Sequence, residues 1–168
     1  MKLFSSRSAR VEQALLPHLD AAHNLAHWLV GTPQDAEDAV QEACVRALTF
    51  FDGFHGEDGR AWLLAIVRNT CYDWLRKRSR LVPLDEIDAP PDGGPGPEAQ
   101  QLREADRILV RRSIESLPAE YREVIVLREM EGMSYKEIAR VIDTPIGTVM
   151  SRLARGRKRL EQLLGAAR

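Results

Sequence analysis

A stretch rich in proline and glycine divides the chain into two parts, and this division constrains the fold more than any other feature. Residues 81–100 hold five of the nine prolines and three glycines, without helical or strand periodicity. Proline removes backbone donors and glycine raises the entropic cost of ordering, so we predict a flexible linker. A long surface loop inside one domain is the alternative, but compact domains rarely carry such loops. We expect one domain over residues 1–80, an acidic linker over 81–102 and a second domain over 103–168.

Apolar residues before the linker recur at three- and four-residue steps, which predicts helices. One helix is expected from about Leu15, a second from Thr32 and Pro33, and a third over about 60–78. Threonine is a good N-cap and proline suits the first helical position. The three apolar stripes are Leu15, Leu19, Ala22, Ala26 and Leu29; Ala36, Val40, Ala43, Ala47 and either Phe50 or Phe51; and Leu63, Ile66, Val67, Thr70, Cys71 and Trp74. With no alternating strand pattern anywhere, the predicted fold is all-α.

The part after the linker predicts a helix-turn-helix. A helix over 102–117 and another from Pro118 to Gly132 precede the sequence Ser134-Tyr135-Lys136-Glu137, which is a capping box. The short helix that follows ends at Asp143, and Thr144 is expected to cap a long final helix with Pro145 at its first position. The final helix is expected to turn Ile146, Val149, Leu153, Leu160 and Leu164 inward. A short helix, a tight turn and a longer helix are typical of DNA-binding domains.

Charge is distributed unevenly along the chain, although the formal net charge is only −1. The final segment, residues 144–168, carries six basic residues and one acidic residue. Such a basic end indicates contact with a polyanion. If Val149 and Leu153 face the core, helical geometry turns Thr148, Ser151, Arg155 and Lys158 outward, where arginine can bind guanine edges and lysine can neutralise phosphate.

A second polar face lies on the predicted helix over 60–78. It carries Asn69, Asp73, Arg76, Lys77 and Arg80, with Trp62 and Tyr72 near its edges. Aromatic rings beside a basic strip suit unstacked bases. A solvated face over core tryptophans is the simpler interpretation of this pattern taken alone.

Together these segments resemble bacterial RNA polymerase sigma factors of the extracytoplasmic-function (ECF) group. The stretch DAEDAVQEACVRAL (35–48) resembles region 2.2, and GRAWLLAIVRNTCYDWLRKRSR (59–80) resembles regions 2.3 and 2.4. Residues 116–160 resemble region four almost throughout. The resemblance implies two helical domains that bind RNA polymerase core and promoter DNA, and that help to open the duplex without any covalent chemistry or cofactor.

The resemblance also implies roles for matching positions in region two. Asp38, Gln41 and Glu42 would contact the clamp helices of the largest polymerase subunit, whereas the residues alone predict only a solvated face. Asn69 matches an asparagine at the pocket for a flipped base of the minus-ten element, and the loop over 54–60 would form a wall of that pocket. Asp73, Arg76, Lys77 and Arg80 would continue the minus-ten surface.

In region four, the resemblance assigns Met150, Ser151, Ala154 and Arg155 to the minus-thirty-five element and Arg152 to the DNA backbone. Thr148 and Lys158 belong to the same outward face, and the polymerase flap would be the protein partner of this region. Many relatives carry lysine or arginine at the position of Met150, so the contact expected there is either apolar or missing. An anti-sigma factor is a further implied partner.

Other functions find less support in the sequence. A stand-alone helix-turn-helix regulator would leave residues 35–80 without a purpose. His23 and His27, one turn apart with His18 nearby, could share a metal, but further paired ligands are not evident. Phosphate loops, dinucleotide fingerprints and nucleophile elbows are lacking. Cys44 and Cys71 lie on apolar stripes, where inert core thiols are expected rather than redox sensors. The sequence shows no secretory signal or bilayer-spanning run, which predicts a cytoplasmic protein without membrane insertion.

Overall fold

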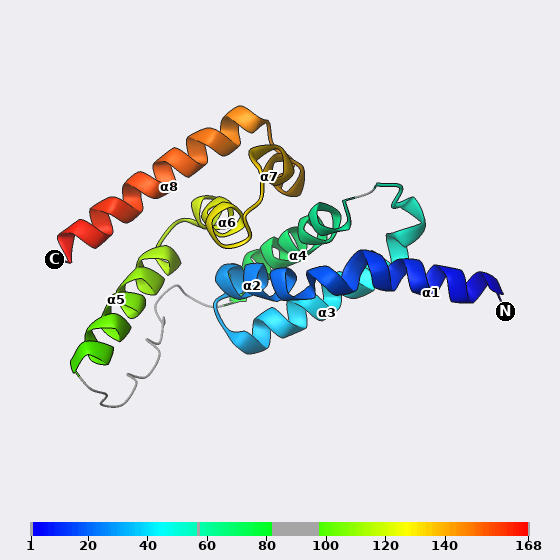
Figure 1. Cartoon of the computed structure of the whole chain (residues 1–168), viewed down its shortest axis with the longest axis horizontal. Coiled ribbons are helices and arrows are strands. Elements are labelled where there is room, and N and C mark those ends of the chain that lie inside the picture. The colour runs from blue at the N-terminus through cyan, green and yellow to red at the C-terminus, as the bar shows by residue number, and fades with distance from the viewer. Residues whose placement is uncertain (1, 57, 82–97, 168) are drawn as a thin grey trace.

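The computed structural model describes residues 2–56, 58–81 and 98–167, with side chains from residue 6 onward and again from 103. All secondary structure within these residues is helical, as predicted (Figure 1). Residues 82–97, which hold most of the predicted linker, lie outside the described residues. The elements are α1 (Lys2–Leu15), η1 (Leu16–His18), α2 (Leu19–Val30), α3 (Pro33–Phe50), η2 (Phe51–Gly53), α4 (Gly59–Leu81), α5 (Glu98–Glu115), α6 (Ala119–Ile125), η3 (Val126–Met130), α7 (Tyr135–Ile142) and α8 (Ile146–Ala166).

Helices α2, α3 and α4 pack against one another as the predicted bundle. The turn between α2 and α3 is local in origin: Gly31 adopts φ +94°, and the Thr32 hydroxyl accepts a hydrogen bond from the Asp35 amide at 3.2 Å. Helix α1 was not predicted. The apolar stripe that begins at Leu15 also spans two helices rather than one, because Pro17 lies in a 3₁₀ turn that separates α1 from α2.

The core of the first half contains small residues on α3 and branched aliphatic residues on α4. Ala36, Ala39, Val40, Ala43 and Ala47 are buried, so α3 approaches its neighbours closely. The sequence left Phe50 and Phe51 as alternatives, and the structure buries Phe51 to 2% exposure while Phe50 remains 66% exposed. Phe51 packs against Phe54 and Trp62, with ring centroids 5.8 and 6.1 Å away.

The second half contains the predicted helix-turn-helix. Gly132 has φ +64°, Ser134 and Glu137 form both hydrogen bonds of the capping box, and Asp143 ends α7 in the left-handed conformation. The segment from Pro118 to Gly132 is divided into α6 and a π-helical turn, η3. Helix α8 packs on α6 through Gly156, where an added Cβ would lie 3.1 Å from Ile125 Cγ1.

The start of α8 differs from the prediction by one residue. Pro145 is the N-cap, and the helix begins at Ile146. Thr144 does not cap it, and its hydroxyl instead donates to the Ile142 carbonyl at 2.9 Å. Ile146 was expected inside but is 44% exposed, whereas Val149 and Leu153 are buried as predicted. The inward face of α8 therefore starts at Val149.

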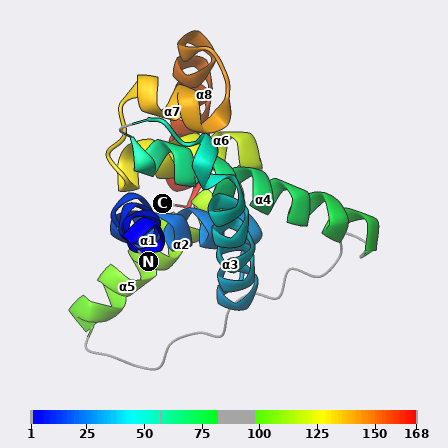
Figure 2. The same cartoon turned by 90° about the vertical axis from the view of Figure 1, so that its right-hand side faces the viewer.

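The two halves are in contact. Helices α6, α7 and α8 lie on one side of α4, and α1, α2 and α3 lie on the other, in both views (Figures 1 and 2). Helix α4 contacts α7, and α2 contacts α6 and η3. Buried residues of both halves form one contiguous apolar cluster. Among the described residues, none of the helices is long and apolar enough to cross a membrane.

Candidate nucleic-acid interface

Helix α4 presents the polar face predicted from the sequence. Asn69, Arg76, Lys77 and Arg80 are exposed and Asp73 is half-buried, while Val67 and Cys71 on the opposite side are buried. The spacing of these residues places the amide near the middle of the helix and the cations toward its C-terminal end. Asp73, Arg76, Lys77 and Arg80 line an open hollow of ≈ 180 Å³. Three basic side chains around one carboxylate give this hollow a positive charge suited to phosphate.

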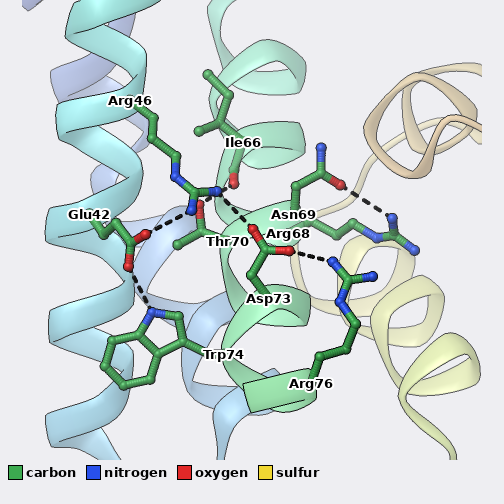
Figure 3. A network of polar contacts seen from close by, with 9 residues as sticks. All are labelled: Glu42, Arg46, Ile66, Arg68, Asn69, Thr70, Asp73, Trp74 and Arg76. Carbon is green, nitrogen blue, oxygen red and sulfur yellow. Dashed lines mark hydrogen bonds and ion pairs between the residues drawn. The ribbon is translucent and has the colours of Figure 1, made fainter.

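Asp73 is held between two arginines (Figure 3). Arg76 donates a hydrogen bond to Oδ1 of Asp73, and Arg46 Nη1 on α3 donates to Oδ2 at 3.1 Å. The hydrogen bond from Arg76 contributes most to lowering the pKa of Asp73, and Arg46 adds to it. Asp73 therefore fixes Arg76 at the hollow, and Arg46 anchors the pair to α3. Sequence reasoning missed Arg46, although its position four residues after Glu42 was a signal.

Glu42 is engaged within the chain. Its Oε1 accepts from Arg46 Nη2 at 2.7 Å, and its Oε2 accepts from Trp74 Nε1 at 2.9 Å (Figure 3). The other two residues predicted on this face are more accessible: Gln41 is exposed, and half-buried Asp38 accepts a 3.5 Å hydrogen bond from Gln34. The structure thus brings Glu42 together with the α4 network rather than with a free outer surface.

The outer surface of α3 also carries exposed apolar residues, which the sequence analysis did not anticipate. Val45 is 63% exposed and Leu48 is 44% exposed. Together with Gln41 they follow steps of four and three residues, so they share one face of the helix. Exposed aliphatic side chains in a row are typical of a surface that binds another protein. The signal was present in the sequence as two apolar residues outside the Ala36/Val40/Ala43 stripe.

Helix α8 presents the second predicted face. Met150, Ser151, Ala154, Arg155 and Lys158 are exposed, and Thr148 and Arg152 are half-buried. Ser151 Oγ donates to the Thr148 carbonyl at 3.0 Å. Within the described part of the chain, the side chains of Arg155 and Lys158 form no hydrogen bond or ion pair. These two cations are thus available to an external anion.

Arg152 differs from the other cations of this face. Its guanidinium nitrogens lie 3.9 Å from Glu120 Oε2 and 3.9 Å from Glu123 Oε1 on α6. The predicted contact of Arg152 with the DNA backbone would have to replace these ion pairs. The same α6 carboxylate, Glu123, also binds Arg68 of α4, a residue that sequence reasoning did not single out.

The histidines and cysteines form no site of their own in the described ranges, where groups of three or more potential metal ligands are lacking. Burial lowers the pKa of His18, with a further contribution from Arg60, and burial also lowers the pKa of His27. Both thiols are free. Burial raises the pKa of Cys71 to about 12 and also raises that of half-buried Cys44.

Comparison with known proteins identifies both halves of the chain. The model of Sigma-70 region 2 matches residues 15–81, and that of Sigma-70, region 4, matches residues 107–160. The ECF RNA polymerase sigma-E factor of Escherichia coli (strain K12) is 39% identical over 138 residues, which cover 76% of this chain and 72% of that protein. The ECF RNA polymerase sigma factor SigE of Mycolicibacterium smegmatis is 33% identical over 159 residues, covering 91% and 61%.

Two solved structures are also similar. The sigma factor RpoE from Bartonella quintana, in complex with the anti-sigma factor NepR, has a TM-score of 0.72 and 32% identity over 94% of this chain and 98% of that one. CnrH, in complex with the cytosolic domain of CnrY, has a TM-score of 0.67 and 28% identity over 95% and 90%. The fold, the two polar faces and these matches agree. The chain belongs to the ECF group of sigma-70 factors and is a transcription initiation factor that directs RNA polymerase to promoters.

Proposed function

We propose that three surfaces divide the work of initiation: the outer face of α4 captures the minus-ten element, the outer face of α8 reads the minus-thirty-five element, and the outer face of α3 contacts polymerase core. In this proposal residues 1–80 and 103–168 act as separate domains, and residues 81–102 connect them. The main support is the pair of polar faces on α4 and α8, each exposed and each rich in basic residues.

On α4, the exposed amide of Asn69 offers a donor and an acceptor to the edge of an extruded base. The hollow lined by Asp73, Arg76, Lys77 and Arg80 follows directly along the helix and suits the adjoining phosphates. Opening the duplex costs a few kcal/mol of stacking and pairing, which capture of an unstacked base offsets. The α4 face therefore assists opening by binding the separated strand.

On α8, Arg155 can donate two hydrogen bonds to a guanine edge in the major groove, and Lys158 can neutralise a phosphate. Exposed Met150 and Ala154 suit apolar contact, for example with a thymine methyl group. Ser151 and Thr148 complete the face. Arg152 contacts the DNA backbone when a phosphate replaces Glu120 and Glu123 of α6 as its ion-pair partners. This combination predicts a minus-thirty-five sequence that differs from that of relatives with a basic residue at the Met150 position.

On α3, the partner surface consists of Asp38, Gln41, Val45 and Leu48. We assign it to the clamp helices of the largest polymerase subunit, while region four binds the flap. Glu42 then acts chiefly by holding Arg46 and Trp74, since both of its carboxylate oxygens are occupied inside the chain. The aliphatic pair Val45 and Leu48 supplies the apolar area that a stable protein contact needs.

The chain contributes binding and positioning, and we assign no covalent step to it. It acts in the cytoplasm, where its polymerase and promoter are. The two similar solved structures are complexes of a sigma factor with NepR and of CnrH with the cytosolic domain of CnrY. We infer that an anti-sigma factor also binds this chain. A stand-alone helix-turn-helix regulator is not favoured, because it would not use the region that matches Sigma-70 region 2.

The test of this function is reconstitution with RNA polymerase core on a library of promoter fragments, with mapping of the transcript starts. We expect starts only with the complete holoenzyme and a shared pair of upstream elements. The variant Val45→Asp should abolish assembly with core, whereas Leu16→Asp, a control at a 58% exposed leucine of η1 outside this surface, should have a smaller effect. Specific binding of the chain to duplex DNA, with no effect of added core, would contradict the proposal.

A further inference from the structure

Helix α1 lies outside the three surfaces that we assign to promoter and polymerase. It also lies before most of residues 15–81, the part of the chain that the model of Sigma-70 region 2 matches. Residues 6–10 are exposed, and only the second half of α1 packs on the core. The helix is therefore held to the bundle at a few places, and these places surround the loop over 54–58 that joins η2 to α4.

Two arginines of α1 contact the segment that leads into this loop (Figure 1). Arg7 Nη2 donates to the Leu48 carbonyl at 3.1 Å, and Arg7 Nε donates to Asp52 Oδ1 at 3.3 Å. Leu48 lies in the last turn of α3, where carbonyls lack donors within the helix and a cation is favourable. Arg10 lies over the Phe51 ring, 5.6 Å from its centroid. Arg7 and Arg10 thus hold the end of α3 and the turn η2, from which the loop starts.

The C-terminal end of α1 contacts the point at which the loop enters α4. An added Cβ at Gly59, the first residue of α4, would lie 2.5 Å from the carbonyl oxygen of Ala14. Only glycine permits so close an approach of the two backbones. Asp58 precedes Gly59, and its Oδ1 accepts a hydrogen bond from the Ala61 amide at 3.0 Å, as an N-cap does. Helix α1 therefore holds the second end of the loop as well as the first.

Aromatic rings connect the two ends beneath the loop. Phe54 is the first loop residue and is half-buried, with its ring centroid 5.8 Å from that of Phe51 and 4.8 Å from that of Trp62 on α4. The Phe54 amide also donates to the Phe51 carbonyl at 2.9 Å. Because closely packed rings cannot move independently, a shift of Phe51 beneath Arg10 would also move Phe54.

A short loop with both ends held has few conformations open to it. Such restriction matters for a loop that forms the wall of a binding pocket, because selective pockets keep their walls within about 0.5 Å of the productive geometry. A wall whose ends could move would adapt to several bases and discriminate poorly among them. The contacts of α1 at both ends therefore supply a property that base selection needs.

We propose that α1 is a positioning element for base selection: Arg7, Arg10 and the close contact of Ala14 with Gly59 hold the loop over 54–58 in the conformation that forms a wall of the minus-ten base pocket. This inference rests on the proposed capture of a minus-ten base at α4, with the predicted loop over 54–60 as a wall of the pocket. Arg7 and Arg10 touch no base in this arrangement. They act through the end of α3 and through the rings of Phe51 and Phe54.

The test measures base preference rather than activity alone. Holoenzyme transcribes a library of promoters randomised over the minus-ten element, and sequencing of barcoded transcripts gives the ratio in which the preferred base and each other base are used. The double variant Arg7→Ala/Arg10→Ala should lower this ratio about 5-fold, because a lost hydrogen bond of this kind usually shifts an equilibrium by about that factor. Arg7→Lys/Arg10→Lys should restore most of the ratio, since lysine keeps a cation near the carbonyl and the ring. Glu12→Ala, at an exposed position of the same helix, is the matched control.

Two outcomes of this experiment would overturn the proposal. Parental ratios in the double alanine variant would show that α1 does not influence base selection. An equal loss of transcription from every promoter, with the ratios unchanged, would show that Arg7 and Arg10 contact phosphate or support folding only. Circular dichroism and assembly with polymerase core check that each variant is folded.

A glycine substitution tests the second end of the loop. Gly59→Ala forces the backbones of α1 and α4 apart and should lower the base ratio at least as much as the arginine pair does. Gly53→Ala, at the start of the loop, is the control, because an added Cβ there meets nothing within 4 Å. If Gly59→Ala does not fold, the exposed arginine pair decides the outcome.

Hydrogen exchange separates this inference from the proposed function. In the free chain, the Phe54 amide should exchange about 5-fold faster in Arg7→Ala/Arg10→Ala than in the parent, and at the parental rate in Glu12→Ala. Unchanged exchange in the arginine variant would show that α1 does not hold the loop. Faster exchange together with parental base ratios would instead contradict the proposed function at this point, because the loop would be held by α1 without forming a wall of the base pocket.

Discussion

Side chains on opposite sides of α4 contribute differently to the stability of the fold. Asn69 is exposed, and among the described residues its side chain forms one hydrogen bond, which Oδ1 accepts from neighbouring Arg68 Nη1 at 3.3 Å. Cys71, two residues later, is completely buried. Helix α4 thus carries the amide that we propose binds a flipped base on one side and a buried thiol on the other, and each supports a separate prediction.

Replacing Asn69 by alanine should affect promoter opening and leave folding almost unchanged. Exposed substitutions usually alter the free energy of unfolding by less than about 0.5 kcal/mol. The Asn69→Ala holoenzyme should form the closed complex normally and the open complex poorly, as measured by permanganate footprinting of unpaired thymines. A pre-melted promoter is the control and should restore part of the opening, but not the base preference. Parental opening together with parental base preference would remove Asn69 from the site.

Cys71 should be unreactive in the folded chain. Because burial raises its pKa to about 12, the reactive thiolate is about 10⁻⁴ of the population at pH 8. Treatment with iodoacetamide and peptide mass mapping should find Cys71 unmodified in the native protein and fully modified in urea. Half-buried Cys44 serves as the internal comparison, with intermediate reactivity. Rapid modification of Cys71 in the native protein would show that the core around α4 opens readily. It would also contradict the prediction that this thiol has no redox role.

Whole helices determine which residues can act together. Helix α8 is fixed by Val149 and Leu153 in the core and by the close approach of Gly156 to Ile125. This packing turns Arg155 and Lys158 to the outside, as the helical period predicted. On α3, the same logic places Val45 and Leu48 outside, because small alanines occupy the inner face.

The orientation of α8 predicts different consequences for its two exposed cations. Arg155→Ala should cost about 1–3 kcal/mol of binding to the cognate element and relax the base preference at one position. Lys158→Ala should weaken binding to all sequences equally and reduce the salt slope by about one unit. Affinities measured across salt concentrations, on cognate and scrambled duplexes, distinguish the two. Identical behaviour of both variants on both duplexes would show that α8 is oriented differently in the complex.

At the scale of the whole molecule, the two halves are joined by the connecting chain and by an interface that combines apolar packing with polar contacts. The predicted linker contains five prolines and no basic residue. The halves also meet through α4 with α7 and through α2 with α6. Each half can therefore fold by itself and still pack against the other half.

Cleavage within residues 81–100 should leave two folded fragments. Each half has its own packed helices, and exposed segments rich in proline and glycine are preferred sites of proteolysis. Elastase or thermolysin at low concentration should produce two stable fragments, identified by mass spectrometry, and each should retain helical circular dichroism. A matched digestion in urea shows where the protease cuts the unfolded chain. Simultaneous degradation of both halves would indicate one indivisible domain instead.

The sequence alone determined the features whose causes are local. The N-cap at Thr32, the capping box of Ser134 and Glu137, and the outward face of Arg155 all follow from interactions within one or two helical turns. Helical period likewise predicted the polar face of α4. The sequence patterns of regions two and four, in their order along the chain, were specific enough to indicate the family that the comparisons then showed.

Only the tertiary structure decided features that depend on residues far apart in the chain. Phe51 rather than Phe50 is buried because Phe54 and Trp62 pack against it. Glu42 turns inward because Trp74, 32 residues later, supplies a donor. The burial of Glu123 depends on Arg68, 55 residues earlier. A periodic pattern reports which side of a helix is apolar, but it cannot report which distant charge will meet that helix, because this depends on how separate elements pack.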